Sequence, residues 1–509
     1  MTGSTSESRL RFAGALAIGA VVVAVLTALV VLIRAGGDPG DAATWPITWE
    51  LRSSDNGTLF QLLTDVVAGR RLDWSFSPQV YVFPELPISG LAFVVTGGDL
   101  YLYCVVVAVF DQVLFFVVLA ALARVLWPTG SAALRAGVAM TPLLLLPLVG
   151  TTWVFSFHLA PTYYVGMYLA LLAAPLLLLV RTWATRIPLA SALALTIASN
   201  PLTAVFAAPG AVAVLVVRLL RSGRRGLGRP LVVVAAVAVA ATVARVVFTP
   251  LQGTGLLTYV DLEVFRSRVA ALGPYWSYQV LDPAARVLLP LGALAALACL
   301  VAAGRTSWML ARRVEMVHES RAYVTVFLGV VPVGGLAATF AALITHYYYF
   351  WPVLVLPFVL LLFAVPPRAV HRALAAGAVA IVAVAVATGG VPNLAGTRYF
   401  GYRAAETRCL DAVVPGQVGY ATFSDARRVG LPSATGIRLV PVTAELEPNT
   451  WLTNRAYFRD AHPTFLYVNE HGDERALDGD AIRARFGDPA RTASCGDGRR
   501  VLIYDSALR

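Results

Sequence analysis

Long apolar runs separated by short arginine-rich segments dominate the pattern along this chain. A helix of about twenty apolar residues crosses the roughly 30 Å hydrocarbon core of a bilayer. Inside lipid, a helix also satisfies its own backbone hydrogen bonds. The pattern therefore predicts about eleven transmembrane helices. We place them over residues 13–34, 100–124, 136–156, 163–181, 187–200, 202–220, 230–248, 284–304, 322–345, 350–366 and 372–391.

The apolar stretch 187–220 is interrupted by Asn200-Pro201. Arginines precede it at Arg186 and follow it from Arg218 onward. Arginine near helix ends favours the cytoplasmic side of a membrane. Both ends of the stretch therefore favour that side, which predicts a hairpin of two short helices. With this hairpin the N-terminus lies in the cytoplasm and the C-terminus lies outside it.

The spans divide the chain into a transmembrane domain, residues 1–391, and a C-terminal domain, residues 392–509. Two long outer segments interrupt the first: loop one, 35–99, and loop two, 249–283. The C-terminal domain alternates short β-like runs with a helical pattern at 479–486, which is typical of a small α/β domain. The β-like runs cover residues 417–423, 437–443, 464–469 and 501–505. We expect a polytopic α-helical membrane protein with a small extracytoplasmic α/β domain.

The amino-acid composition also indicates that lipid is the main solvent of this chain. Hydrophobic residues make up 58% of the chain and charged residues 14%, against about a quarter charged in soluble proteins. The net charge is +11, and arginine beside helix ends sets orientation and meets anionic lipid. We therefore expect membrane lipid, and not nucleic acid, as a partner. Basic residues that are all arginine suggest a GC-rich genome and a bacterial plasma (inner) membrane.

The four cysteines fall into two classes. Cys104 and Cys299 lie in apolar segments and are expected to pack there. Cys409 and Cys495 lie in polar segments of the C-terminal domain, outside the cytoplasm, where disulfides persist. They are predicted to form a disulfide, with two free thiols as the alternative.

Loop one combines acids with aromatic residues, a mixture that suits sugar binding because carboxylates take hydroxyl protons and rings pack on sugar faces. Asp55 precedes an amphipathic stretch at 58–68, predicted to lie on the membrane surface. A second apolar piece, 87–95, is too short to span. Asp55 is thus expected where a lipid-linked head group would sit. The alternatives are a turn acid for Asp55 and a solvated or structural acid for Glu85.

Several motifs resemble the GT-C glycosyltransferases, in a branch of uncharacterised bacterial integral membrane proteins. The resemblance implies a polyprenyl-phosphate-linked sugar as donor, and a glycan, lipid or protein of the cell envelope as acceptor. It implies inverting transfer on the outer face of the membrane. The motifs are Asp55-Asn56-Gly57, Asp73-Trp74-Ser75-Phe76-Ser77-Pro78, Phe83-Pro84-Glu85, His346-Tyr347-Tyr348-Tyr349-Phe350-Trp351-Pro352 with Pro357, Pro448-Asn449-Thr450-Trp451 and Asn454-Arg455.

The resemblance also implies roles for single residues. Asp55 would be the general base, and Glu85 is the next candidate. Cations or a bound divalent ion would stabilise the leaving phosphate. The residues expected to bind substrate are Trp74, Arg245, Arg266, Arg268, His346 and Tyr347.

Two other functions stay open. Asp111 lies within a predicted span, where ionisable residues often mark a transport pathway. The main alternative is therefore a non-enzymatic transporter or flippase for an envelope precursor. A structural subunit of an envelope-assembly complex is the third. Arg245 could also reach the interface by snorkelling, and the aromatic run near Tyr347 could form an interfacial belt.

Overall fold

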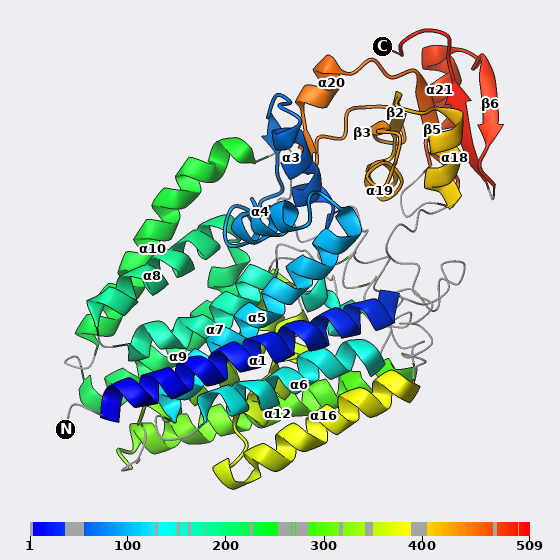
Figure 1. Cartoon of the computed structure of the whole chain (residues 1–509). Helices are drawn as coiled ribbons and strands as arrows, with labels where there is room; N and C mark the ends of the chain where they lie inside the picture. The colour runs from blue at the N-terminus through cyan, green and yellow to red at the C-terminus, as the bar shows by residue number, and fades with distance from the viewer. Residues whose placement is uncertain are drawn as a thin grey trace.

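The structure is a computed structural model in which a helical bundle carries a small sheet domain at one end (Figure 1). It describes residues 4–35, 55–127, 131–149, 153–160, 164–180, 182–223, 227–252, 266, 270, 283–314, 319–341, 350–387, 405–471, 476–496 and 498–508. The N-terminus and the C-terminal sheet lie at opposite ends of the bundle (Figure 1).

Every predicted span contains a helix. Seven of the described helices are long and apolar enough to cross a membrane: α1, α5, α6, α9, α10, α12 and α16. A multi-pass membrane protein is thereby confirmed, and the count of eleven spans stays a prediction. The bundle consists of α1 (Ser4–Ala35), α5 (Leu100–Leu126), α6 (Ala132–Val149), α7 (Val165–Leu179), α8 (Trp183–Ser199), α9 (Leu202–Ser222), α10 (Gly228–Phe248), α12 (Pro283–Ala311), α13 (Glu319–Ala341), α14 (Trp351–Leu354), α15 (Leu356–Phe363) and α16 (Val370–Ala387).

The outer surface of the bundle is apolar, as contact with lipid requires. On α10, five valines are between 61% and 67% exposed: Val232, Val239, Val243, Val246 and Val247. An apolar face of this kind is costly in water and is satisfied by acyl chains.

The predicted break at Asn200-Pro201 is present. Asn200 ends α8, and its side-chain oxygen accepts the N–H of Leu202 at 3.2 Å, so it caps the next helix. Proline cannot donate a backbone hydrogen bond, which favours the break at this point. The two helices then pack on different partners, α8 on α10 and α9 on α13.

The C-terminal domain is a five-stranded mixed sheet with short helices. The strand order is β3-β2-β5-β7-β6; β2 runs parallel to β3 and β5, and β7 runs antiparallel to β5 and β6. Each predicted β-like run contains a strand, and β6 was not predicted. The elements are α18 (Ala405–Val413), β2 (Val418–Ala421), α19 (Phe423–Arg428), β3 (Arg438–Pro441), α20 (Ala456–Asp460), β5 (Phe465–Asn469), α21 (Gly479–Phe486), β6 (Arg491–Ser494) and β7 (Arg499–Ile503).

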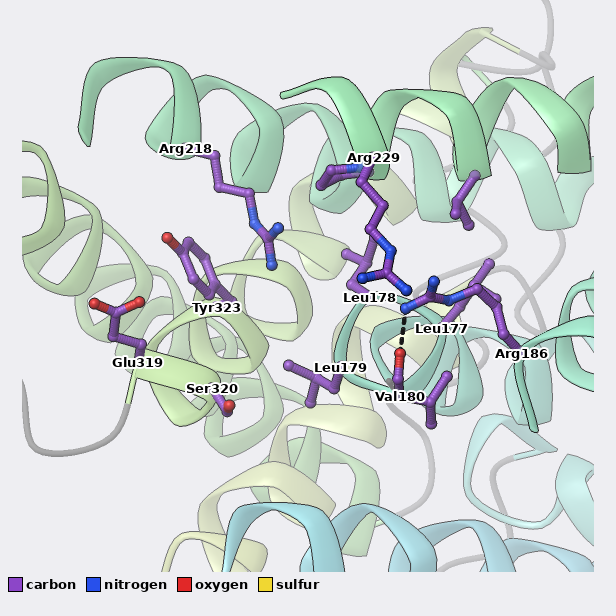
Figure 2. A pocket seen from close by; sticks show the side chains of 12 residues that line it. Leu177, Leu178, Leu179, Val180, Arg186, Arg218, Arg229, Glu319, Ser320 and Tyr323 are labelled. Carbon is purple, nitrogen blue, oxygen red and sulfur yellow. Dashed lines mark hydrogen bonds between the residues drawn. The ribbon is translucent and has the colours of Figure 1, made fainter. Parts of the chain in front are cut away.

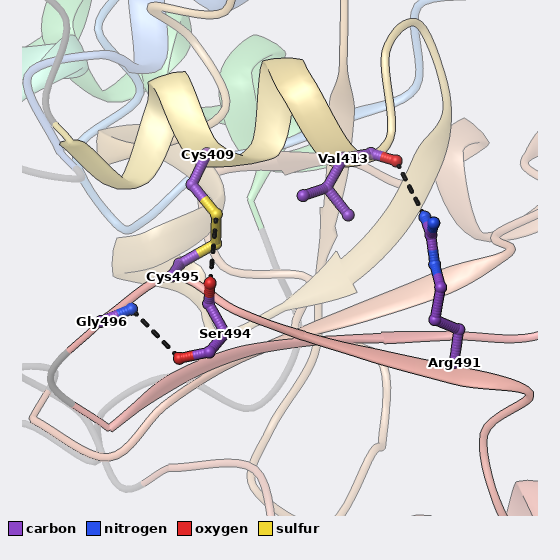
Figure 3. The surroundings of a disulfide bond; sticks show 6 residues. All are labelled: Cys409, Val413, Arg491, Ser494, Cys495 and Gly496. Atoms are coloured by element: carbon purple, nitrogen blue, oxygen red, sulfur yellow. Dashed lines mark hydrogen bonds between the residues drawn. A yellow bond between two sulfur atoms is a disulfide. The ribbon is translucent and has the colours of Figure 1, made fainter.

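A disulfide ties the first helix of this domain to its last hairpin (Figure 3). It joins Cys409 of α18 to Cys495, which follows β6, with their Cα atoms 5.7 Å apart. These are the two cysteines that the sequence predicts to pair. Cys104 and Cys299 are buried in the bundle as free thiols.

Loop one folds over the end of the bundle. It forms α3 (Thr58–Val67), β1 (Trp74–Ser75) and α4 (Glu85–Val95). Between β1 and α4, the N–H of Phe76 donates to Leu251 O at 2.8 Å and the N–H of Val80 donates to Ser199 O at 2.9 Å. These bonds fix loop one to the ends of α10 and α8. Most of loop two lies outside the described residues.

Candidate functional site

Loop one and the C-terminal domain are joined by a short antiparallel strand pair. Trp74 of β1 lies opposite Asn454 of β4 (Thr453–Asn454). The N–H of Arg455 continues this contact by donating to the carbonyl oxygen of Asp73 at 2.8 Å. Two of the family-like motifs, Asp73-Trp74 and Asn454-Arg455, therefore meet in the structure although they are far apart in sequence.

Asp65 is the central acid of this junction, and its side chain is fully buried. Its Oδ1 accepts from the hydroxyl of Tyr457 at 2.5 Å and from Nη1 of Arg70 at 2.8 Å, and its Oδ2 accepts from Nδ2 of Asn454 at 3.0 Å. Burial, and then the charge of Asp65, raises the pKa of Tyr457, which keeps the hydroxyl a donor. With both oxygens engaged, Asp65 is an anchor between the two parts.

Asp73 lies at the rim of the junction and receives two guanidinium groups. Arg455 donates to its Oδ1 from Nε at 3.0 Å and from Nη2 at 2.7 Å, and Arg459 donates to its Oδ2. The bond from Arg459, followed by that from Arg455, lowers the pKa of Asp73. The ionised acid therefore holds the C-terminal domain against loop one.

Asp55 begins the turn before α3. Its carbonyl oxygen accepts the N–H of Thr58 at 3.1 Å, and the residue is half-buried. Because this hydrogen bond uses the main chain of Asp55, the residue can form the turn and can also be a reacting acid.

A buried guanidinium from the C-terminal domain lies near this turn. Arg427 of α19 is 3% exposed; its Nη1 donates to Oγ1 of Thr58 at 2.6 Å, and its Nη2 donates to the carbonyl oxygen of Leu452. Burial lowers the pKa of Arg427 to about 10, and the carboxylate of Asp55 is the foremost of the groups that oppose this shift. At neutral pH, Arg427 is therefore a fixed cation beside Asp55.

Glu85 lies at the first position of α4 and is 7% exposed. Its Oε1 accepts the N–H of Gly166, at the start of α7, at 3.2 Å. Burial raises the pKa of Glu85 to about 8, because a low dielectric disfavours the charged form. This geometry is that of the structural acceptor considered above, and at neutral pH the carboxyl is mostly protonated.

Trp74 is covered by loop one itself. Its ring is 5% exposed and stacks on Phe76, with centroids 6.0 Å apart. Its Nε1 is buried with no hydrogen-bond partner among the described residues. The sugar contact of Trp74 stays a prediction, and it requires this ring to become accessible.

The predicted phosphate-binding residues are only partly placed. Arg245 is half-buried at the loop-one end of the bundle, where its Nη1 donates to Ala198 O at the end of α8, at 3.0 Å. Arg266 is exposed. Arg268, His346 and Tyr347 lie outside the described residues.

The acids of this region do not suit a divalent metal ion. Within the described ranges, no group of three or more His, Cys, Asp and Glu side chains could hold one. Beside Asp55 lies the cation Arg427, and the oxygens of Asp65 are engaged.

Asp55 does not line any of three cavities whose walls consist of described residues. One of about 340 Å³ lies between α7, α8, α9, α10 and α13. One of about 420 Å³ lies in the C-terminal domain beside Phe486 and Arg485. One of about 200 Å³ is mainly apolar and lies beside Trp127 and Cys299.

Arg427 is a residue of the candidate site that the sequence did not single out. Its partners Thr58 and Asp55 lie in loop one, and the contact with Thr58 spans 369 residues. The motifs Asp55-Asn56-Gly57 and Asn454-Arg455 indicate loop one and the tail separately, and nothing in either indicates a partner on α19. Comparison of the chain with models of protein families, with curated proteins and with solved structures finds no match in any of the three.

Proposed function

We propose that this chain is a membrane glycosyltransferase of GT-C type. It would transfer a sugar from a polyprenyl-phosphate donor to a cell-envelope acceptor, with inversion, on the outer face of a bacterial plasma membrane. The observation that carries the proposal is the position of Asp55 next to the cation Arg427, at the end of the bundle that loop one and the C-terminal domain cover.

The cation makes Asp55 a suitable base. A positive neighbour favours the ionised carboxylate, and only that form accepts a proton. Asp55 takes the proton of the acceptor hydroxyl, whose oxygen attacks the anomeric carbon. The bond between that carbon and the donor phosphate oxygen breaks, and its electron pair leaves with the lipid phosphate. Arg427 is a positioning residue in this scheme, because Thr58 and Leu452 hold it in place.

The leaving phosphate needs a cation of its own. Arg245 is suited to this role because it lies at the loop-one end of the bundle. It donates to Ala198 O, and the neighbouring Ser199 O accepts the N–H of Val80 in loop one.

One observation favours the transporter alternative. Asp111 of α5 is 3% exposed within a membrane-spanning helix, and its carboxyl interacts electrostatically with that of Glu85. Two interacting buried carboxyls at the junction of loop one and the bundle could pass a proton. If proton-coupled transport were the function, Asp111→Asn would abolish it and Asp55→Asn would leave it intact.

The test compares sugar transfer by wild type, Asp55→Asn and Asp99→Asn, purified in detergent and given radiolabelled polyprenyl-phosphate sugars with envelope extract. Asp99→Asn is the matched control, because Asp99 is a loop-one acid that caps α5 through Leu102 N at 2.8 Å and asparagine also caps helices. We expect transfer to fall about 100-fold or more in Asp55→Asn and to persist in the control.

The variant Arg427→Lys tests whether Arg427 positions Asp55 for transfer or only stabilises the fold. It keeps the charge but not the two-pronged contact with Thr58 and Leu452. We expect a folded protein with slower transfer and a pH–rate profile whose acidic limb moves to higher pH. Equal transfer by Asp55→Asn and wild type would refute Asp55 as the base, and absence of transfer from every donor would count against the enzyme.

A further inference from the structure

A cluster of arginines lines the cavity of about 340 Å³ (Figure 2). The cavity is built from the end of α7, the start of α8, the end of α9 and the starts of α10 and α13. The opposite ends of α7, α8 and α10 contact loop one. The cavity therefore lies at the other end of the bundle, away from Asp55, and a site there does not depend on the proposed function.

Arg186, Arg218 and Arg229 all line this cavity (Figure 2). Arg186 is 6% exposed, and its Nη2 donates to Val180 O. Its Nε and Nη1 are buried with no hydrogen-bond partner in the part of the chain that the structure describes. Unsatisfied donors of a buried cation are costly, so their presence on a cavity wall indicates a missing acceptor.

The other two arginines add positive charge to the same cavity. Arg229 approaches Arg186 (Figure 2), and these like charges disfavour one another. Arg218 lies 4.4 Å from the ring centroid of Tyr323, and its Nε is buried with no hydrogen-bond partner among the described residues. An anion between the three guanidinium groups would relieve the repulsion and accept the remaining donors.

The acid of the cavity does not cancel this charge. Glu319 also lines the cavity, but its side chain is 50% exposed and forms an ion pair with Arg221. Ser320 adds a hydroxyl donor to the wall. Among the described residues that line the cavity, three arginines therefore face one carboxylate, which is already paired with a fourth arginine, Arg221.

The surroundings of the cavity combine an exposed tryptophan with an apolar surface, as is typical of protein near lipid head groups. Trp183 is 58% exposed at the start of α8, and the guanidinium carbons of Arg186 and Arg229 lie 5.0 and 5.7 Å from its ring. Exposed tryptophan is enriched at the membrane–water interface. Ile187 and Val232, 59% and 64% exposed, extend an apolar surface from this point.

We propose that this cavity binds a phosphate-bearing anion, which is either the head group of an anionic membrane lipid or a free phosphate. Arginine matches phosphate because its planar donors pair with two oxygens at once. A lipid phosphate would place its acyl chains on the exposed apolar face of α8 and α10.

The test measures the thermal unfolding midpoint of the full chain in detergent while a probe is titrated. The probes are short-chain phosphatidylglycerol, phosphatidylcholine of the same chain length, and inorganic phosphate at constant ionic strength. The variants are Arg186→Gln and, as the matched control, Arg312→Gln. Arg312 also lies beside an exposed tryptophan, 4.6 Å from the ring of Trp308, and does not line the cavity.

We expect phosphatidylglycerol to raise the midpoint and phosphatidylcholine not to. Arg186→Gln should raise the half-saturating concentration about tenfold, as loss of one charged contact predicts, while Arg312→Gln matches wild type. If only inorganic phosphate stabilises the protein, with the same dependence on Arg186, the ligand is a free phosphate.

Two outcomes would overturn the proposal. One is a response that does not distinguish the two lipids, together with none to phosphate. The other is the same half-saturating concentration in Arg186→Gln and Arg312→Gln. Should Arg186→Gln fail to fold, Arg218→Gln replaces it with the same expectation, because its guanidinium lines the opposite wall.

Discussion

The hydroxyl of Tyr457 donates a 2.5 Å hydrogen bond to Oδ1 of Asp65, which joins the C-terminal domain to loop one. Asp65 is fully buried and also accepts from Arg70 and Asn454. A buried carboxylate is tolerated only when such donors surround it. The domain is therefore held to the bundle by a contact that is costly to break.

Asp65→Asn should loosen this junction. The amide cannot accept from all the donors around Asp65, and Arg70 loses its ionic partner. We expect a loss of about 2–4 kcal/mol in stability, together with faster hydrogen exchange of the β1 and β4 amides. Asp480→Asn is the control, because the Asp480 side chain is 92% exposed and should change stability by less than about 0.5 kcal/mol. Equal exchange rates in the two variants would contradict the anchor role.

Glu85 should make stability depend on pH. Burial raises the pKa of Glu85 in the folded state from its ordinary value of 4.5 to about 8. Between those two values the folded state retains a proton that the unfolded state has lost. Stability attributable to this group is full below about pH 4.5 and falls as pH rises to about 8, by up to about 1.4 kcal/mol per unit.

Glu85→Gln removes this dependence, since glutamine does not titrate and its oxygen can still accept from Gly166. Unfolding midpoints of both proteins between pH 5 and 8 provide the measurement. The advantage of the variant should grow with pH. Glu470→Gln, with a 49% exposed side chain, is the control; a constant difference for Glu85→Gln would mean that Glu85 is ionised in the folded state.

Gly166→Ala tests the contact between α4 and α7. A Cβ on Gly166 would lie 2.3 Å from Cδ of Pro84 and 2.5 Å from Oε1 of Glu85. Such overlap should cost about 1–3 kcal/mol. Gly90→Ala, within α4, meets nothing within 4 Å and should stabilise by about 0.5–1 kcal/mol through helix propensity. Thermal unfolding distinguishes them, and shifts of the same sign would refute the close approach.

The disulfide should stabilise the C-terminal domain. Cys409 and Cys495 enclose a separation of 86 residues, and loss of a native disulfide typically costs about 2–5 kcal/mol. We expect Cys409→Ser/Cys495→Ser to lower the unfolding midpoint and to speed proteolysis within 405–508. Cys104→Ser/Cys299→Ser, at the buried free thiols, is a comparison that should leave proteolysis of that domain unchanged.

The helices could be predicted because lipid leaves the backbone few alternatives. Apolar runs and the arginines beside them marked every helix of the bundle, including the break at Asn200-Pro201. The hydrophobic periodicity and the length of each segment were enough to predict α3 and most strands of the C-terminal sheet. Strand β6 was missed, since its residues are mostly exposed and give no apolar alternation.

The candidate site was predicted only in part. Asp55 and Glu85 were identified by type and position, but burial decides their chemistry, and burial depends on contacts across the whole chain. The proton held by Glu85 follows from the burial of its carboxyl, and the cation beside Asp55 comes from α19. Neither contact leaves a periodic signal in the sequence.

The contact between Thr58 and Arg427 spans 369 residues, and this separation has a consequence for biosynthesis. A ribosome makes loop one early and α19 late. Until α19 has been made and brought to the loop-one end, the turn at Asp55 lacks the guanidinium of Arg427. A chain that ends before α19 cannot form this pairing, so the pairing distinguishes a chain made through α19 from a shorter one.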